Sequence, residues 1–98
     1  MLLGVHISGV SRISDVPVRA HELGCNTLQF FSRSPQRWRS ASIDDDEISL
    51  FRKNRDKFKI NPVFIHIPYL INLASPNPRL YKGSIEAYIE DIREAEKL

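Results

Sequence analysis

Three short apolar runs, each followed by a helical pattern, constrain the fold of this 98-residue chain more than any other feature. The runs cover residues 2–7, 27–31 and 62–67. Their residues are apolar without clean alternation, which is typical of strands covered on both faces. Alternating strands and helices predict an α/β fold with a parallel sheet and right-handed crossovers. We therefore expect the strands in the order 1-2-3, with the helices on one face.

Capping residues suggest where each helix begins and ends. We expect N-caps at Ser14 or Asp15, at Ser42 and at Asn77, with Gly24 ending the first helix and Pro78 opening the third. The acidic residues 44–47 would complement the dipole of the second helix. Helical spacing predicts that the second and third helices bury Ile48, Phe51, Phe58, Tyr81, Ile85, Tyr88, Ile89, Ile92 and Ala95.

Three strands do not complete a domain, because helices wound with one hand cover only one face of a parallel sheet. A (β/α)8 barrel closes the sheet on itself but needs about 250 residues. We therefore interpret residues 1–98 as the N-terminal part of a single TIM-barrel domain, comprising its first three βα units. On its own, such a segment is expected to self-associate through its exposed sheet face and edges.

The composition is that of an ordinary globular protein, with 42% hydrophobic and 27% charged residues. It excludes intrinsic disorder, collagen and a disulfide scaffold. No apolar stretch approaches the ~20 residues of a membrane span, and the N-terminus has no basic region typical of a signal peptide. The single cysteine, Cys25, is expected to be a buried structural thiol, which suits the reducing cytoplasm where we expect the protein.

Positive charge is concentrated in the first 40 residues, which carry five arginines against two acidic residues. The net charge of the whole chain is only +2, too small to indicate a nucleic-acid-binding protein by itself. The local excess lies in the first two connecting segments. It is of the kind that steers an anionic ligand.

Two histidines stand at the carboxyl ends of predicted strands, where parallel α/β folds bind their ligands. His6 ends the first strand and His66 the third. Each is either a metal ligand or acid–base group, or a structural histidine hydrogen-bonded to the backbone. The first and third strands would be nearly 10 Å apart, too far for one metal ion to bridge easily. The segment also lacks His-x-x-His and Cys-x-x-Cys spacings, so it does not build a complete metal site.

Two segments after the strands have residue types suited to DNA. Residues 32–39 combine arginines, which contact phosphates, with a tryptophan that offers a stacking face. Residues 69–73 present apolar side chains of the kind that wedge between base steps. The alternatives are a loop anchored by Trp38 with solvated arginines, and a short turn that fills an apolar gap.

The segment 66–76, with the sequence HIPYLINLASP, resembles a motif of the endonuclease IV family. Further similarity lies in GVHIS at 4–8, ELGCN at 22–26, QFF at 29–31 and the pair Arg37-Trp38. The family comprises zinc-dependent apurinic/apyrimidinic DNA endonucleases with a TIM-barrel fold. The resemblance extends over essentially the whole chain.

The resemblance implies a DNA repair enzyme that hydrolyses the phosphodiester 5′ to an abasic site in double-stranded DNA, using a trinuclear zinc cluster. It implies that His66 is a zinc ligand and leaves His6 as a rim residue without an assigned role. The candidate DNA-binding residues are Arg33, Gln36, Arg37, Trp38, Arg39, Tyr69 and Leu70. The family's other zinc ligands would lie beyond residue 98, so the segment alone is expected to be inactive.

Two departures from the family pattern are expected to affect how DNA is bound. The order Gln36-Arg37 reverses the usual arginine and glutamine before the tryptophan, and residues 10–12 replace a pair of glycines in the first loop. Two other interpretations stay open: a sugar isomerase or epimerase of the related xylose-isomerase-like barrels, and a non-catalytic truncated fragment.

Overall fold

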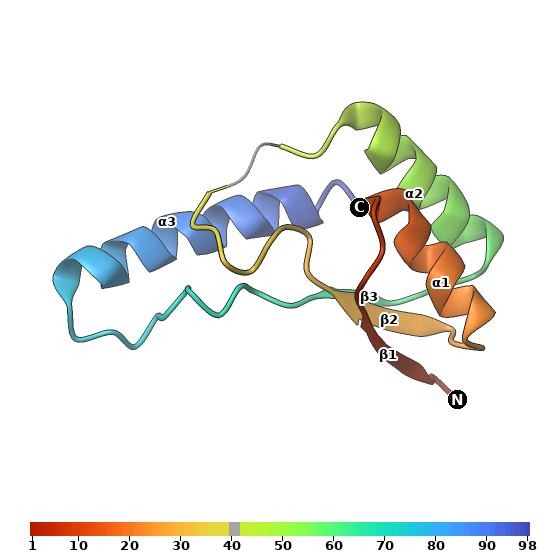
Figure 1. Cartoon of the computed structure of the whole chain (residues 1–98), viewed down its shortest axis with the longest axis horizontal. Helices are drawn as coiled ribbons and strands as arrows, with labels where there is room; N and C mark the ends of the chain where they lie inside the picture. Colours follow the sequence, from red (N-terminus) through yellow and green to blue (C-terminus); the bar gives the residue numbers. More distant parts are fainter. Residues whose placement is uncertain (40–41) are drawn as a thin grey trace.

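The computed structural model describes residues 1–39 and 42–98, which form a three-stranded parallel sheet with helices beside it (Figure 1). The elements are β1 (Gly4–Ile7), the 3-10 turn η1 (Ile13–Asp15), α1 (Val16–Glu22), β2 (Thr27–Phe30), α2 (Asp45–Lys57), β3 (Val63–Ile65) and α3 (Pro78–Ala95). The predicted order of elements is confirmed, and the strands are shorter than the apolar runs that indicated them.

The sheet has the predicted order β1-β2-β3, and both pairs of strands are parallel. In the register, Val5 lies opposite Leu28, and Phe30 lies opposite Ile65. The three helices lie on the same side of the strands in Figure 1, as predicted. The parallel order brings the carboxyl ends of all three strands to one edge of the sheet.

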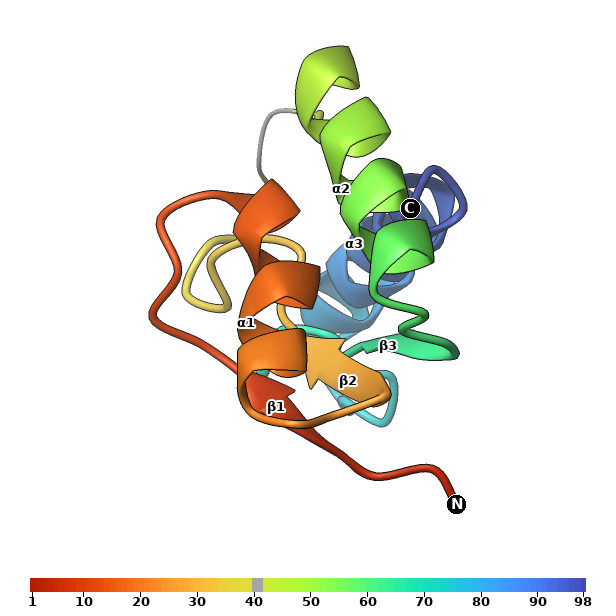
Figure 2. The same cartoon turned by 90° about the vertical axis from the view of Figure 1, so that its right-hand side faces the viewer.

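The hydrophobic core lies between the strands and the helices α1 and α2, which Figure 2 shows side by side above the sheet. Leu28 and Phe30 point from β2 into this core, where the ring of Phe30 stacks on Phe51 of α2 with 5.6 Å between centroids. Cys25 is buried in the same core, as predicted. The alternate residues of the strands, among them His6 and Gln29, therefore point to the opposite face, which none of the described helices covers.

The first helix ends as predicted but does not begin with the predicted cap. Neither Ser14 nor Asp15 makes a side-chain capping bond, because the turn η1 leads directly into α1. At its end, Gly24 has a φ of +78°, and the Cys25 N–H donates to the Ala20 carbonyl at 2.9 Å. This left-handed conformation is the one that glycine adopts at least cost.

The cap of α2 is Asp44 rather than the predicted Ser42. The Asp44 carboxylate accepts a hydrogen bond from the Asp46 N–H at 2.9 Å, and the helix begins at Asp45. At the other end, Lys59 takes a left-handed φ of 55° where a glycine is usual. Of the predicted stripe, Ile48 and Phe51 are buried and Phe58 is partly buried.

The predicted buried stripe of α3 is largely exposed, although its predicted cap is confirmed by bonds from Arg79 and Leu80 N–H to Asn77 Oδ1. Tyr81, Ile89 and Ile92 are exposed by 46%, 42% and 45%. The residues that α3 buries are instead Ser84, Ala87 and Asp91. The other residues of the stripe, Ile85, Tyr88 and Ala95, are partly buried. An open cavity of about 410 Å³ beside β3 is lined by Tyr88, Ile92 and Ala95 of this stripe, among others.

None of the described helices is long and apolar enough to cross a membrane.

Candidate metal and nucleic-acid site

An aromatic cluster lies at the carboxyl ends of the three strands, on the face that the described helices leave uncovered. The ring of Phe31 lies edge-on to His6 and to His66, with centroids 4.9 and 5.0 Å away. The two imidazoles are 6.2 Å apart. The side chains therefore come closer together than the spacing of the first and third strands suggested.

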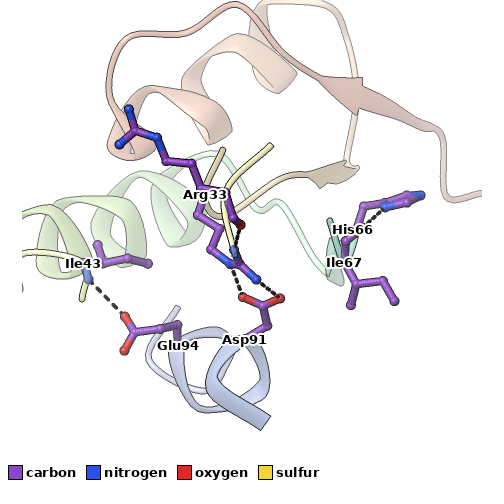
Figure 3. A network of polar contacts seen from close by, with 7 residues as sticks. Arg33, Ile43, His66, Ile67, Asp91 and Glu94 are labelled. Carbon is purple, nitrogen blue, oxygen red and sulfur yellow. Dashed lines mark hydrogen bonds and ion pairs between the residues drawn. The ribbon is translucent and has the colours of Figure 1, made fainter. Parts of the chain in front are cut away.

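His66 is held with one ring nitrogen engaged and the other free. Its Nδ1 lies 2.6 Å from the carbonyl oxygen of Ile67 (Figure 3). A carbonyl oxygen only accepts hydrogen bonds, so in the neutral ring Nδ1 carries the proton and Nε2 presents a lone pair. A backbone carbonyl bonded to the second nitrogen is the arrangement that orients histidines which bind metals.

His6 is held in the opposite way. The side-chain amide nitrogen of Gln29 lies 3.0 Å from His6 Nδ1. An amide nitrogen only donates, so Nδ1 accepts and the proton of the neutral ring lies on Nε2. Because His6 and Gln29 are paired residues of adjacent strands, the sheet itself sets this contact.

His66 has the chemistry of one zinc ligand but has no companions for a complete site. Within residues 1–39 and 42–98, no group of three or more His, Cys, Asp or Glu side chains is placed to hold a metal ion. His66 by itself supplies one donor of the kind that zinc uses.

The loop after β2 is fixed to α3 by a buried ion pair (Figure 3). Arg33 Nε lies 2.7 Å from Asp91 Oδ1, and Nη2 lies 3.2 Å from Oδ2. The two side chains are only 8% and 5% exposed. Arg33 also donates to the backbone carbonyl of Arg37. Its guanidinium therefore holds the loop in place, and its contact with DNA stays a prediction.

The rest of this loop presents its polar and aromatic side chains to solvent. Gln36, Arg37, Trp38 and Arg39 are all exposed. Arg39 approaches Glu86 of α3 at 3.8 Å, but both side chains are well solvated and such a pair is weak. Trp38 is therefore not a buried anchor, and these residues are accessible to a ligand.

The segment after β3 combines an exposed tip with a buried attachment. Tyr69 is 63% exposed and Leu70 is partly buried, whereas Ile71 is buried. The buried hydroxyl of Ser84 accepts a hydrogen bond from the Asn72 N–H at 2.9 Å. Ser84 and Asp91 thus fix both rim segments to one helix, and Figure 1 shows α3 running beside them.

A third contact joins α3 to the segment that precedes α2. Glu94 accepts a hydrogen bond from the Ile43 N–H at 3.0 Å and pairs with Lys97 (Figure 3). Burial acts to raise the pKa of Glu94. The bonds from Lys97 and Ile43, together with the Lys97 charge and Ser42, outweigh burial and hold the pKa below its ordinary value of 4.5.

Three residues of this arrangement were not identified from the sequence: Gln29, Ser84 and Asp91. Gln29 could have been found, because it is a polar residue inside an apolar strand run. Ser84 and Asp91 gave no local signal, since their partners are 12 and 58 residues away in the chain.

The chain is similar in sequence to several curated endonucleases, although no protein-family model matches it. It is 43% identical over 98% of its length to a probable endonuclease 4 from Thermoplasma acidophilum, and 38% identical over 94% to one from Aquifex aeolicus. It is 36% identical over 97% of its length to apurinic-apyrimidinic endonuclease 1 of Saccharomyces cerevisiae. These matches cover 34%, 32% and 27% of the relatives, so the chain spans about a third of their length.

The fold is similar to that of a solved structure. The crystal structure of endonuclease IV from Thermus thermophilus superposes with a TM-score of 0.90 and 28% sequence identity. The match covers all of this chain and 37% of the other. The resemblance inferred from the sequence motifs is therefore confirmed by both comparisons.

Proposed function

We propose that this chain, which is related over nearly its whole length to the endonuclease IV family, is the N-terminal part of a barrel that cleaves DNA at abasic sites. One observation carries the proposal. His66, with Nε2 free, stands at a strand end beside two rim segments that expose Gln36, Arg37, Trp38 and Tyr69. A nitrogen with a free lone pair beside a cationic, aromatic rim suits metal-assisted hydrolysis of a DNA phosphodiester.

Zinc is the metal that we propose for this site, with His66 as one ligand and the others outside residues 1–98. Tetrahedral zinc sites use imidazole nitrogen as a standard ligand. When bound, the metal would stabilise the charge that develops on the phosphate. Three zinc ions, as the family resemblance implies, would fit a barrel in which later strands contribute further ligands at the same edge.

The residues of this chain would bind and orient double-stranded DNA that contains an abasic site. Arg37 and Arg39 would contact phosphates, and Trp38 would offer a stacking surface. Tyr69 and Leu70 would enter the duplex at the lesion. Arg33 would hold the loop through Asp91, and it would contact phosphate only if that pair opened. A DNA substrate and a single buried cysteine support a cytoplasmic location.

The test is incision of a duplex with one abasic site by the complete barrel. This protein can be prepared as the full-length product, or as residues 1–98 fused to the remaining two-thirds of the Thermoplasma acidophilum relative. We expect His66→Ala to lower zinc content and abolish most cleavage, and Tyr69→Ala to keep the metal and weaken recognition of the lesion.

The control is His21→Ala, which removes an exposed imidazole of α1 that stacks on Phe58, away from the carboxyl ends of the strands. It should keep zinc and activity. Residues 1–98 alone should not cleave, because one ligand neither holds nor orients zinc. Full zinc content and full activity in His66→Ala would refute the proposal.

A further inference from the structure

We propose that His6 is a phosphate-binding residue, whose Nε2–H donates a hydrogen bond to a non-bridging oxygen of the DNA phosphodiester beside the His66 metal position. The inference deepens the proposed function and rests on it. The sequence alone assigns His6 no role at the rim. Its contacts now define what its free nitrogen can do.

The contact with Gln29 makes His6 a donor rather than a metal ligand. Gln29 donates its amide N–H to Nδ1 at 3.0 Å, which leaves the proton of the neutral ring on Nε2. A metal needs a lone pair, and the only one on this ring is already engaged. His66 shows the opposite pattern, with Nδ1–H donated to Ile67 and a lone pair on Nε2. The two histidines are therefore complementary: one accepts a metal, and the other donates to an anion.

The two imidazole rings lie close together at this edge of the sheet. Their centroids are 6.2 Å apart. An anion that accepts a hydrogen bond from His6 would therefore lie close to His66.

The position of His6 is preorganised by the sheet. It lies on β1, opposite Gln29 in the register, and the edge of Phe31 packs against it at 4.9 Å. Side chains on strands are held more precisely than those on loops. The ring is also exposed on the face that no helix covers, so a bound anion can approach it.

Two sources could supply an anionic oxygen at this place: the phosphodiester of bound DNA, or a carboxylate ligand from the rest of the barrel. We infer that the acceptor is the phosphodiester. The two sources can be distinguished by what happens to the metal when His6 is replaced. If a carboxylate that binds zinc were the acceptor, loss of His6 would weaken the metal site. If the phosphate is the acceptor, loss of His6 would leave the metal in place and slow cleavage.

The experiment compares wild type, His6→Phe and His6→Gln in the complete, zinc-loaded barrel. Long-range ¹H–¹⁵N spectra of the histidine rings should show the proton of wild-type His6 on Nε2. His6→Phe should keep full zinc content and lose about 10- to 100-fold in kcat/KM on an abasic-site duplex, the effect of removing one donor to a charged group. His6→Gln, which restores an N–H donor, should recover part of this loss.

The salt dependence of binding provides a second readout. A neutral donor releases no counterions, so the log–log salt slope of DNA binding should be the same in His6→Phe and wild type. Arg37→Ala is the matched comparison and should reduce that slope by about 1. A slope that also changes in His6→Phe would mean that His6 binds as a cation, which would overturn the proposal.

Two further results would overturn it: a proton on Nδ1 of His6, or loss of zinc in His6→Phe. Unchanged kcat/KM in His6→Phe with zinc retained would do the same. Failure of the proposed function is a different result, since wild type itself would then not cut the abasic-site duplex. The ring spectra would still report the His6 tautomer in that case.

Discussion

Breaking the ion pair between Arg33 and Asp91 should cost more stability than any other single polar change on α3. Asp91→Asn keeps the shape of the side chain but removes its charge, and it leaves the Arg33 guanidinium buried without a counter-charge. The wild-type pair is bidentate, at 2.7 and 3.2 Å, and its side chains are 8% and 5% exposed. Removing one partner of such a pair costs roughly 3–5 kcal/mol.

The assay is urea unfolding of the complete barrel, with Glu86→Gln as the matched control. Glu86 is also an acid on α3 that faces an arginine of the same loop, but its pair with Arg39 is long and solvated. An exposed pair of this kind contributes at most about 1 kcal/mol. If Asp91→Asn lowered the free energy of unfolding no more than Glu86→Gln does, the Arg33–Asp91 pair would not fix the loop.

The double variant Arg33→Met/Asp91→Leu separates stability from loop position. Replacing a buried pair with apolar side chains of similar size is often neutral or stabilising. The double variant should therefore unfold close to wild type, yet it lacks the bond from Arg33 to the Arg37 carbonyl. We expect weaker DNA binding despite regained stability. Equal binding by wild type and double variant would exclude a positioning role for Arg33.

Three smaller predictions concern backbone and pH. Lys59→Gly should stabilise the protein by about 0.5–1 kcal/mol, because φ is 55° there, and Lys57→Gly, in a helix, should do the opposite in the same unfolding assay. Gly4→Ala should destabilise it by about 1–3 kcal/mol, since the new Cβ would lie 2.3 Å from a carbonyl oxygen of β2; an unchanged unfolding midpoint would contradict this. Because the pKa of Glu94 is lower in the folded state, its ionised carboxylate stabilises the folded protein at pH values above the ordinary pKa of 4.5. This contribution is lost as the pH falls through the lower pKa of the folded state. In Glu94→Gln, the free energy of unfolding measured in urea should therefore fall less steeply with pH on the acid side than in wild type. If the two proteins lost stability in parallel as pH fell, the Glu94 contacts would not contribute.

The order and direction of the strands could be predicted because alternating apolar runs and helical patterns leave few topologies open. Which side of α3 is buried could not be predicted. Helical spacing identifies the apolar side of a helix, but the rest of the protein decides which side is covered. In this chain Ser84 and Asp91 face inward, because each makes a hydrogen bond with a distant loop.

Only part of the candidate site could be predicted from the sequence. His6 and His66 were placed at the rim by the rule for strand ends, and the exposed residues of both rim segments followed from their position after strands. The tautomers of the two histidines depend on Gln29 and on the Ile67 carbonyl. Such contacts depend on strand register and loop conformation, which apolar patterns do not specify.

The bond between Arg33 and Asp91 also bears on the order in which the chain acquires its structure during synthesis. Most of the core between β1, β2, α1 and α2 uses residues that leave the ribosome early and that come from neighbouring segments, although Leu98 also packs in it. The loop after β2 cannot take its final position until Asp91, 58 residues later, has been made and α3 has docked. The loop after β2 therefore becomes ordered late, after most of the scaffold that carries it.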